Sequence, residues 1–146
     1  MKAKLFIALA LFVGLFVSCD QKEEVRVYPN TASQDIAGTY SGTWTLTNDK
    51  GESSEVNGTI VFAATEQAYV ANITVTAEGS ADRSDVCNVS HANDGLVFYN
   101  NVGTSFGAKF SGEIDENGTI LMSYTITEMQ GRFQVTNNYK FSGVRK

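Results

Sequence analysis

Residues 36–46 read IAGTYSGTWTL, and from Tyr40 onward apolar and hydroxyl-bearing positions alternate without a break. Successive side chains of a β-strand point to opposite faces, so this period of two predicts a strand over residues 40–47 with one dry and one wet face. The dry face carries Tyr40, Gly42, Trp44 and Leu46, and the wet face carries Ser41, Thr43, Thr45 and Thr47.

The same alternation recurs along the chain and predicts further strands over residues 56–62, 69–75, 87–91, 96–98, 106–114, 120–126 and 133–141. Short turn sequences such as Asp115-Glu116-Asn117-Gly118 separate these segments. From residue 36 onward no helical periodicity predicts a helix that could pack on the apolar face, so the sheet must close on itself to bury that face. The pattern predicts an all-β fold: an eight-stranded antiparallel up-and-down barrel over residues 36–146. Inward glycines permit the tight coiling that closure requires; they are Gly42, Gly58, Gly112 and Gly143.

The N-terminus carries a different pattern. An uncharged apolar run of 13 residues, Leu5 to Val17, follows Lys2 and Lys4. It is too short to span a bilayer, for which ~20 residues are needed, but it fits the apolar region of a signal peptide. We therefore predict that residues 1–18 are a signal peptide and that residues 19–35, which are polar and hold the only proline, are a flexible tether.

The end of that run resembles the lipobox of bacterial lipoproteins, in which a small residue precedes a cysteine that is acylated and becomes the new N-terminus. Here the cysteine is Cys19. The next residues resemble the short signal that sends some Gram-negative lipoproteins to the outer face of the outer membrane; they are Gln21, Lys22, Glu23 and Glu24. The resemblance implies a lipid-anchored protein of the outer membrane that faces the cell exterior and contacts the membrane through its acyl chains. The alternative is ordinary secretion, but no A-x-A cleavage site precedes the polar segment.

The G-x-W of Gly42-Thr43-Trp44 resembles the first strand of the calycin group, which comprises lipocalins, fatty-acid-binding proteins and avidins. With the lipobox and the polar tether, residues 36–146 look most like the calycin-like barrel lipoproteins of Gram-negative gut anaerobes. The T-D-Y motif of the kernel lipocalins is missing. The resemblance implies that Gly42, Trp44 and Arg145 close the barrel, with the arginine stacked on the tryptophan in a cation–π contact.

The overall charge excludes some partners. The chain has 11 basic and 16 acidic residues and a net charge of −5; without residues 1–18 it has 9 basic residues and a net charge of −7. An acidic chain with scattered basic residues has no electrostatic footprint for nucleic acid, so we expect no nucleic-acid partner. If Cys19 is acylated, Cys87 is the only remaining thiol, and no internal disulfide can form.

Candidate catalytic groups are few. Cys87 and His91, the only histidine, share a strand face but lie four residues, or about 13 Å, apart, too far for a nucleophile and its base. Three acidic residues near turns, Asp82, Asp85 and Asp94, do not match the spacing of an EF-hand loop. We therefore expect no enzymatic activity, no metal and no cofactor.

The inward side chains divide the predicted barrel into two halves. The half nearer the N-terminus is aromatic and forms a plug of Tyr40, Trp44, Phe62, Tyr69, Phe110, Tyr139 and Phe141. The other half resembles a small-molecule cup with an apolar wall and few polar points; it is lined by Leu46, Val56, Val75, Phe98, Phe106, Tyr124, Ile126, Phe133 and Asn137. We expect this cup to hold a small apolar ligand. The alternative is a solid barrel that recognises protein or glycan through its loops and outer face, as an adhesin, an inhibitor or an accessory subunit of an outer-membrane or host complex.

Replacement of the lipobox cysteine tests the predicted anchor. Cys19→Ala should block lipoprotein processing and remove the acyl chains, since residues 20–146 contain no second apolar segment of comparable length and are net negative. A chain that begins at Asp20 should be soluble with an intact fold. Cell fractionation and mass spectrometry of the N-terminal peptide measure both. Membrane retention of the Cys19→Ala chain would contradict the anchor.

Overall fold

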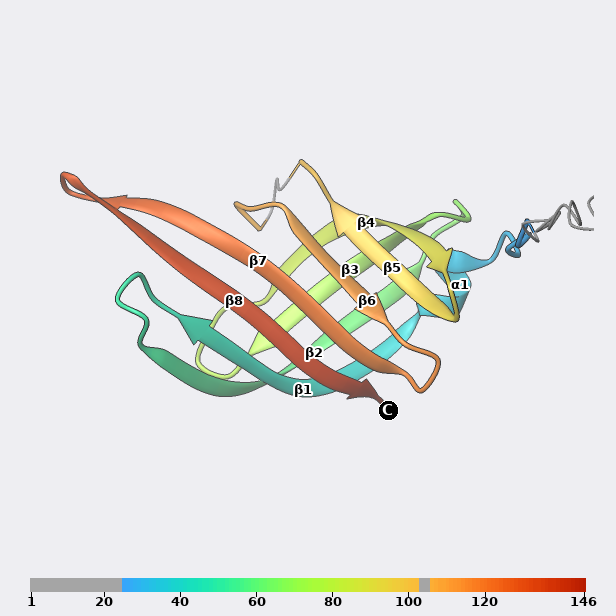
Figure 1. Cartoon of the computed structure of the whole chain (residues 1–146), viewed down its shortest axis with the longest axis horizontal. Coiled ribbons are helices and arrows are strands. Elements are labelled where there is room, and N and C mark those ends of the chain that lie inside the picture. Colours follow the sequence, from blue (N-terminus) through green and yellow to red (C-terminus); the bar gives the residue numbers. More distant parts are fainter. Residues whose placement is uncertain (1–24, 103–105) are drawn as a thin grey trace, which may run out of the picture.

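A computed structural model describes residues 25–102 and 106–146 of the protein. These residues form one closed antiparallel β-barrel in which each strand pairs with the next and β8 pairs with β1 (Figure 1). The elements are α1 (Ala32–Ile36), β1 (Gly38–Thr47), β2 (Ser53–Ala64), β3 (Val70–Ala77), β4 (Arg83–Ala92), β5 (Gly95–Asn100), β6 (Phe110–Ile114), β7 (Thr119–Gln130) and β8 (Phe133–Arg145). The predicted all-β, eight-stranded up-and-down barrel is confirmed.

One predicted strand is shorter than expected. β6 begins at Phe110 rather than at residue 106. Gly107 has a φ of +68°, a left-handed conformation that interrupts an extended strand. Phe106 is nevertheless fully buried and packs against Phe110 with a ring-centroid distance of 4.7 Å. Phe106 therefore packs inside the barrel, although it lies in a loop.

The short helix α1 was not predicted. It packs against β2, β3 and β4 at one end of the barrel, and Ala32 and Ile36 are fully buried there. Ser33 is buried as well; its hydroxyl donates to the Val70 carbonyl at 2.6 Å and accepts from the Thr65 amide at 3.0 Å. Residues 32–35 therefore form part of the packed barrel, whereas the sequence pattern assigned them to the tether. Five residues are too few for helical periodicity to be visible.

The predicted inward glycines form a row across three strands. Gly42 of β1 pairs with Gly58 of β2 on one side and with Gly143 of β8 on the other. A Cβ atom on Gly58 would lie 2.5 Å from Cδ1 of Trp44, and one on Gly42 would lie 2.5 Å from the Cα of Gly143. The row thus leaves room for the indole ring and lets the strands coil closely.

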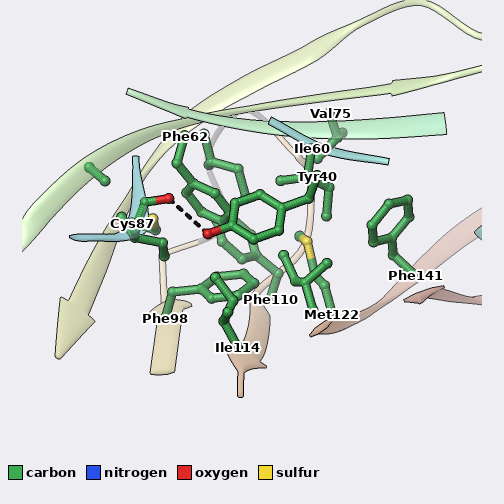
Figure 2. Packing of buried hydrophobic residues seen from close by; sticks show 14 of the residues in the cluster. Tyr40, Ile60, Phe62, Val75, Cys87, Phe98, Phe110, Ile114, Met122 and Phe141 are labelled. Atoms are coloured by element: carbon green, nitrogen blue, oxygen red, sulfur yellow. Dashed lines mark hydrogen bonds between the residues drawn. The ribbon is translucent and has the colours of Figure 1, made fainter. Parts of the chain in front are cut away.

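Aromatic and aliphatic side chains fill the barrel from α1 to about its middle. Figure 2 shows Tyr40, Phe62 and Phe98 turned toward one another, with ring-centroid distances of 5.7 Å for Tyr40–Phe62 and 4.9 Å for Phe62–Phe98. The Tyr40 hydroxyl donates to the Ile36 carbonyl at 3.1 Å, which ties this core to α1. Tyr69, predicted to join the plug, is 52% exposed because it precedes the first residue of β3.

The hairpin of β7 and β8 extends beyond the barrel at the end opposite α1 (Figure 1). β1 pairs with β8 only as far as Asn138, and β6 pairs with β7 only as far as Tyr124. Beyond these points the two strands pair with each other alone, up to Gln130 and Phe133. Phe133 is 78% exposed. The helix found in the described residues is too short to cross a membrane.

A methyl group in the glycine row should destabilise the protein. Gly42→Ala should lower the free energy of unfolding by about 3 kcal/mol, because the new Cβ meets the backbone of β8 and overpacks the wall. Gly51→Ala is the matched control: its Cβ meets nothing, so only the strain of a φ of +79° remains, about 1 kcal/mol. Urea denaturation measures both. Equal losses in the two variants would disprove the close-approach argument.

Candidate functional site

The core stops short of the end opposite α1 and leaves a cavity of about 160 Å³ there. Six strands contribute to its wall, which is mainly apolar and aromatic, while the turn after β3 forms part of the rim. The lining residues are Trp44, Leu46, Ser54, Val56, Val75, Ala77, Glu78, Ser80, Ala81, Arg83, Tyr124 and Tyr139. An apolar hollow with a few polar groups at its edge is the usual form of a small-molecule site.

Trp44 links this cavity to the filled part of the barrel. Its indole N–H donates to the Thr76 carbonyl at 3.1 Å, which sets the orientation of the ring across the barrel. The ring packs against Phe141, with a centroid distance of 4.9 Å, and edge-on against Tyr124 at 5.7 Å. The tryptophan is buried, so the cavity rests on a rigid aromatic base.

Two tyrosines form one side of the cavity. The rings of Tyr124 and Tyr139 are stacked, 4.6 Å apart with an angle of 7° between their planes. Burial raises the pKa of Tyr124 to about 12, and the nearby Arg83 cation opposes this rise in part. Neither hydroxyl has a hydrogen-bond partner among the residues that the structure describes. Both hydroxyl groups are therefore free to bind a ligand.

Arg83 is the one basic residue in the lining. It opens β4 opposite Val75, and its guanidinium donates to the Phe106 carbonyl at 3.0 Å. Within the described part of the chain it forms no ion pair with a carboxylate. Glu78 lies on the same rim but is exposed at the turn, whereas Arg83 is half-buried. The positive charge is therefore the more enclosed of the two.

The structure brings together four of the nine predicted cup residues: Leu46, Val56, Val75 and Tyr124 line the cavity. Three others, Phe98, Phe106 and Ile126, are buried in the core instead of lining this space. Asn137 is half-buried and outside the lining, and Phe133 lies at the exposed hairpin tip. The period-two pattern of a strand shows which face a residue lies on, but not how far along the barrel axis it lies. Phe133 lies outside because β8 continues past the barrel rim.

Eight of the twelve lining residues were not predicted for the cup, and two of them, Tyr139 and Arg83, carry polar groups that the site uses. Tyr139 was assigned to the plug, but it pairs with Leu46 and with Tyr124, so it lies at the open end. Arg83 was not singled out, although it shares the inward parity of Cys87. Its even spacing from Cys87 was the sequence signal that could have identified Arg83 as inward-facing.

The cavity volume limits what can bind inside. An apolar protein cavity of about 150 Å³ is known to take a benzene-sized molecule. The described barrel therefore has room for one ring, and side chains fill most of the predicted cup.

Compared with protein-family models and with curated protein sequences, the chain matches neither.

At the opposite end of the barrel Arg145 stacks on an aromatic ring, but the ring is not the one that the resemblance implied. Its guanidinium carbon lies 5.8 Å from the centre of the Tyr40 ring, and its N–H groups donate to the carbonyls of Asp35 and Ala37. The resemblance had implied Trp44. Arg145 pairs directly with Tyr40 across β1 and β8, whereas Trp44 lies four residues, or about 13 Å, further along β1.

The remaining candidate groups are apart from the cavity. Cys87 is buried, and this burial raises the pKa of its thiol to about 12. His91 contacts the Asp35 carboxylate at 2.9 Å near α1 and stacks on Tyr28. No group of three acidic, histidine or cysteine side chains suited to a metal occurs within residues 25–102 and 106–146. Cys19 and the predicted export signal, Gln21 to Glu24, lie outside the described residues.

A second hollow, of about 510 Å³, lies on the outer face of β5 to β8. Its apolar side chains include Val97, Tyr99 and Leu121, of which Tyr99 and Leu121 are exposed. Polar side chains surround them: Ser111, Glu113, Ser123 and Lys140. This surface resembles the kind of site that the alternative interpretation requires.

The raised pKa of Tyr124 predicts a loss of stability at alkaline pH. The unfolded chain releases this proton near the ordinary tyrosine pKa of 10, whereas the folded chain holds it up to about 12. The free energy of unfolding should therefore fall as pH rises between these values. Tyr124→Phe should make this fall shallower, as measured by urea denaturation at a series of pH values. Tyr99→Phe, on the outer face, controls for loss of a tyrosine; identical pH profiles for wild type and Tyr124→Phe would contradict the prediction.

Proposed function

We propose that the protein is a non-catalytic binding protein, anchored to the outer membrane through acylated Cys19 and facing the cell exterior, whose end cavity holds a small apolar ligand. The observation that supports ligand binding is the cavity: at the end opposite α1, the otherwise filled barrel leaves a ring-sized apolar space next to Trp44. Its size supports a ligand with one ring or an equally compact apolar group.

The position of the cavity suits an anchored binding protein. The tether enters the barrel at α1, which packs at the closed end with Tyr40 and Arg145. The cavity lies at the other end of β1, next to Leu46. An anchor at the N-terminus would therefore hold the closed end nearer the membrane and leave the cavity accessible from outside.

A binding role fits the side chains better than catalysis does. Cys87 and His91 are separated along β4, the thiol is buried, and neither residue lines the cavity. A nucleophile and a base within hydrogen-bond reach of a substrate space are needed for most covalent catalysis.

A second candidate function is recognition of a protein or glycan by the outer surface. The hollow on β5 to β8 and the projecting β7–β8 hairpin support it, since Met129 and Phe133 are well exposed near the hairpin tip. Exposed apolar side chains of this kind are typical of contact surfaces.

Toluene should bind in the cavity and change the fluorescence of Trp44, the only tryptophan of the chain. Val56→Phe should abolish the change, because the larger side chain fills the space from a half-exposed position. Val86→Phe is the matched control: it makes the same substitution at an exposed position of β4 outside the cavity, and this variant should bind toluene as the wild type does. Toluene binding that survives Val56→Phe, or failure of toluene and of other one-ring ligands alike to bind the wild type, would refute the cavity and favour the outer-surface candidate.

A further inference from the structure

The end cavity combines an apolar floor with an enclosed positive charge at its edge. Arg83 lines the cavity together with Tyr124 and Tyr139, and it is half-buried at the start of β4. We propose that Arg83 is an anion anchor and that the cavity therefore binds a ring-sized carboxylic acid more tightly than a neutral molecule of the same size. This inference rests on the proposed function and names the class of its ligand.

Arg83 has donors to spare. A guanidinium carries five N–H donors, and the described residues give it a single hydrogen bond, to the Phe106 carbonyl. That bond holds one side of the group against the loop before β6, which limits the side chain to few positions. A cation removed in part from water is costly unless an anion meets it. No carboxylate of the described chain does so.

The two tyrosines complete the site. Their hydroxyl groups lack hydrogen-bond partners among residues 25–102 and 106–146, and their stacked rings form a wall between Trp44 and the cavity rim. A carboxylate accepts hydrogen bonds from a guanidinium and a phenol at the same time, and bonds of this charge-assisted kind are the strong ones. The Arg83 charge also acts on the Tyr124 hydroxyl, as the partial lowering of its pKa indicates.

Glu78 is the one acidic side chain on the rim and would oppose an anion. It lies in the turn after β3 and is exposed, so water screens its charge more than that of half-buried Arg83. Of the two charged side chains in the lining, Arg83 is therefore the one whose charge water screens less.

The cavity volume restricts the class of ligand further. A space of about 160 Å³ accepts one ring, so the carboxylate must be attached to the ring directly or through a very short chain to reach Arg83. A long acyl tail has no room inside, because Trp44, Tyr124 and Phe141 pack against each other below the cavity. Short aryl or alicyclic carboxylic acids are the class that satisfies both the size and the charge.

Phenylacetate and phenylacetamide form a matched pair that tests the anchor, because they are similar in size and differ in charge. Titrated against Trp44 fluorescence of the full chain, the acid should bind at least about tenfold more tightly than the amide, with an advantage that shrinks as salt is added. Arg83→Met should reduce the ratio of the two affinities to about one, and Arg83→Lys should keep part of it. Arg26→Met removes an arginine at the α1 end, where it pairs with Asp94, and should leave the ratio unchanged.

The outcomes separate the two proposals. Equal binding of acid and amide by wild type, with toluene still bound, overturns the anion anchor and leaves the proposed function in place. Failure of toluene, phenylacetate and phenylacetamide alike overturns the proposed function and the anchor with it. If Arg83→Met does not fold, as thermal denaturation would show, the ratio in wild type, its salt dependence and the Arg83→Lys variant still decide the question.

Discussion

The contact on which the rest of this barrel depends is that of the Trp44 ring with Gly58 of the neighbouring strand β2. Gly42, Gly58 and Gly143 lie side by side in β1, β2 and β8, and no side chain at these positions would fit. The indole occupies the freed space next to Gly58 and donates its N–H to the Thr76 carbonyl of β3. Strand curvature, barrel closure and the position of the largest core side chain are thus set by one arrangement.

That arrangement also divides the interior. On the α1 side of Trp44, aromatic rings and aliphatic side chains fill the barrel, and α1, Tyr40 and Arg145 close it. On the other side the wall continues, but the next large rings, Tyr124 and Tyr139, stack against each other at one edge. The cavity is the space that this stacking leaves open. Its small size follows from close packing, since protein interiors leave few voids larger than a water molecule.

The same packing also partly removes the polar groups around the cavity from water. On an open surface, water would hydrate a guanidinium and two phenols and compete with a ligand for their hydrogen bonds. Here burial raises the pKa of Tyr124 to about 12, and water screens the charge of half-buried Arg83 less than it would on an open surface. Recognition of a charged group attached to a ring needs such an enclosed combination of donors and apolar wall.

The sequence alone determined the fold class, since period-two alternation names the dry face of every strand and Gly42, Gly58, Gly112 and Gly143 mark where the wall must coil. It also indicated that Arg145 closes the barrel. The height of each side chain within the barrel was decided only by tertiary structure, because register and shear set it: Tyr139 faces Leu46 at the open end, Phe133 lies beyond the rim, and Arg145 meets Tyr40. The helix α1 and the cavity edge at Arg83 depend on contacts between distant segments, which no local pattern records.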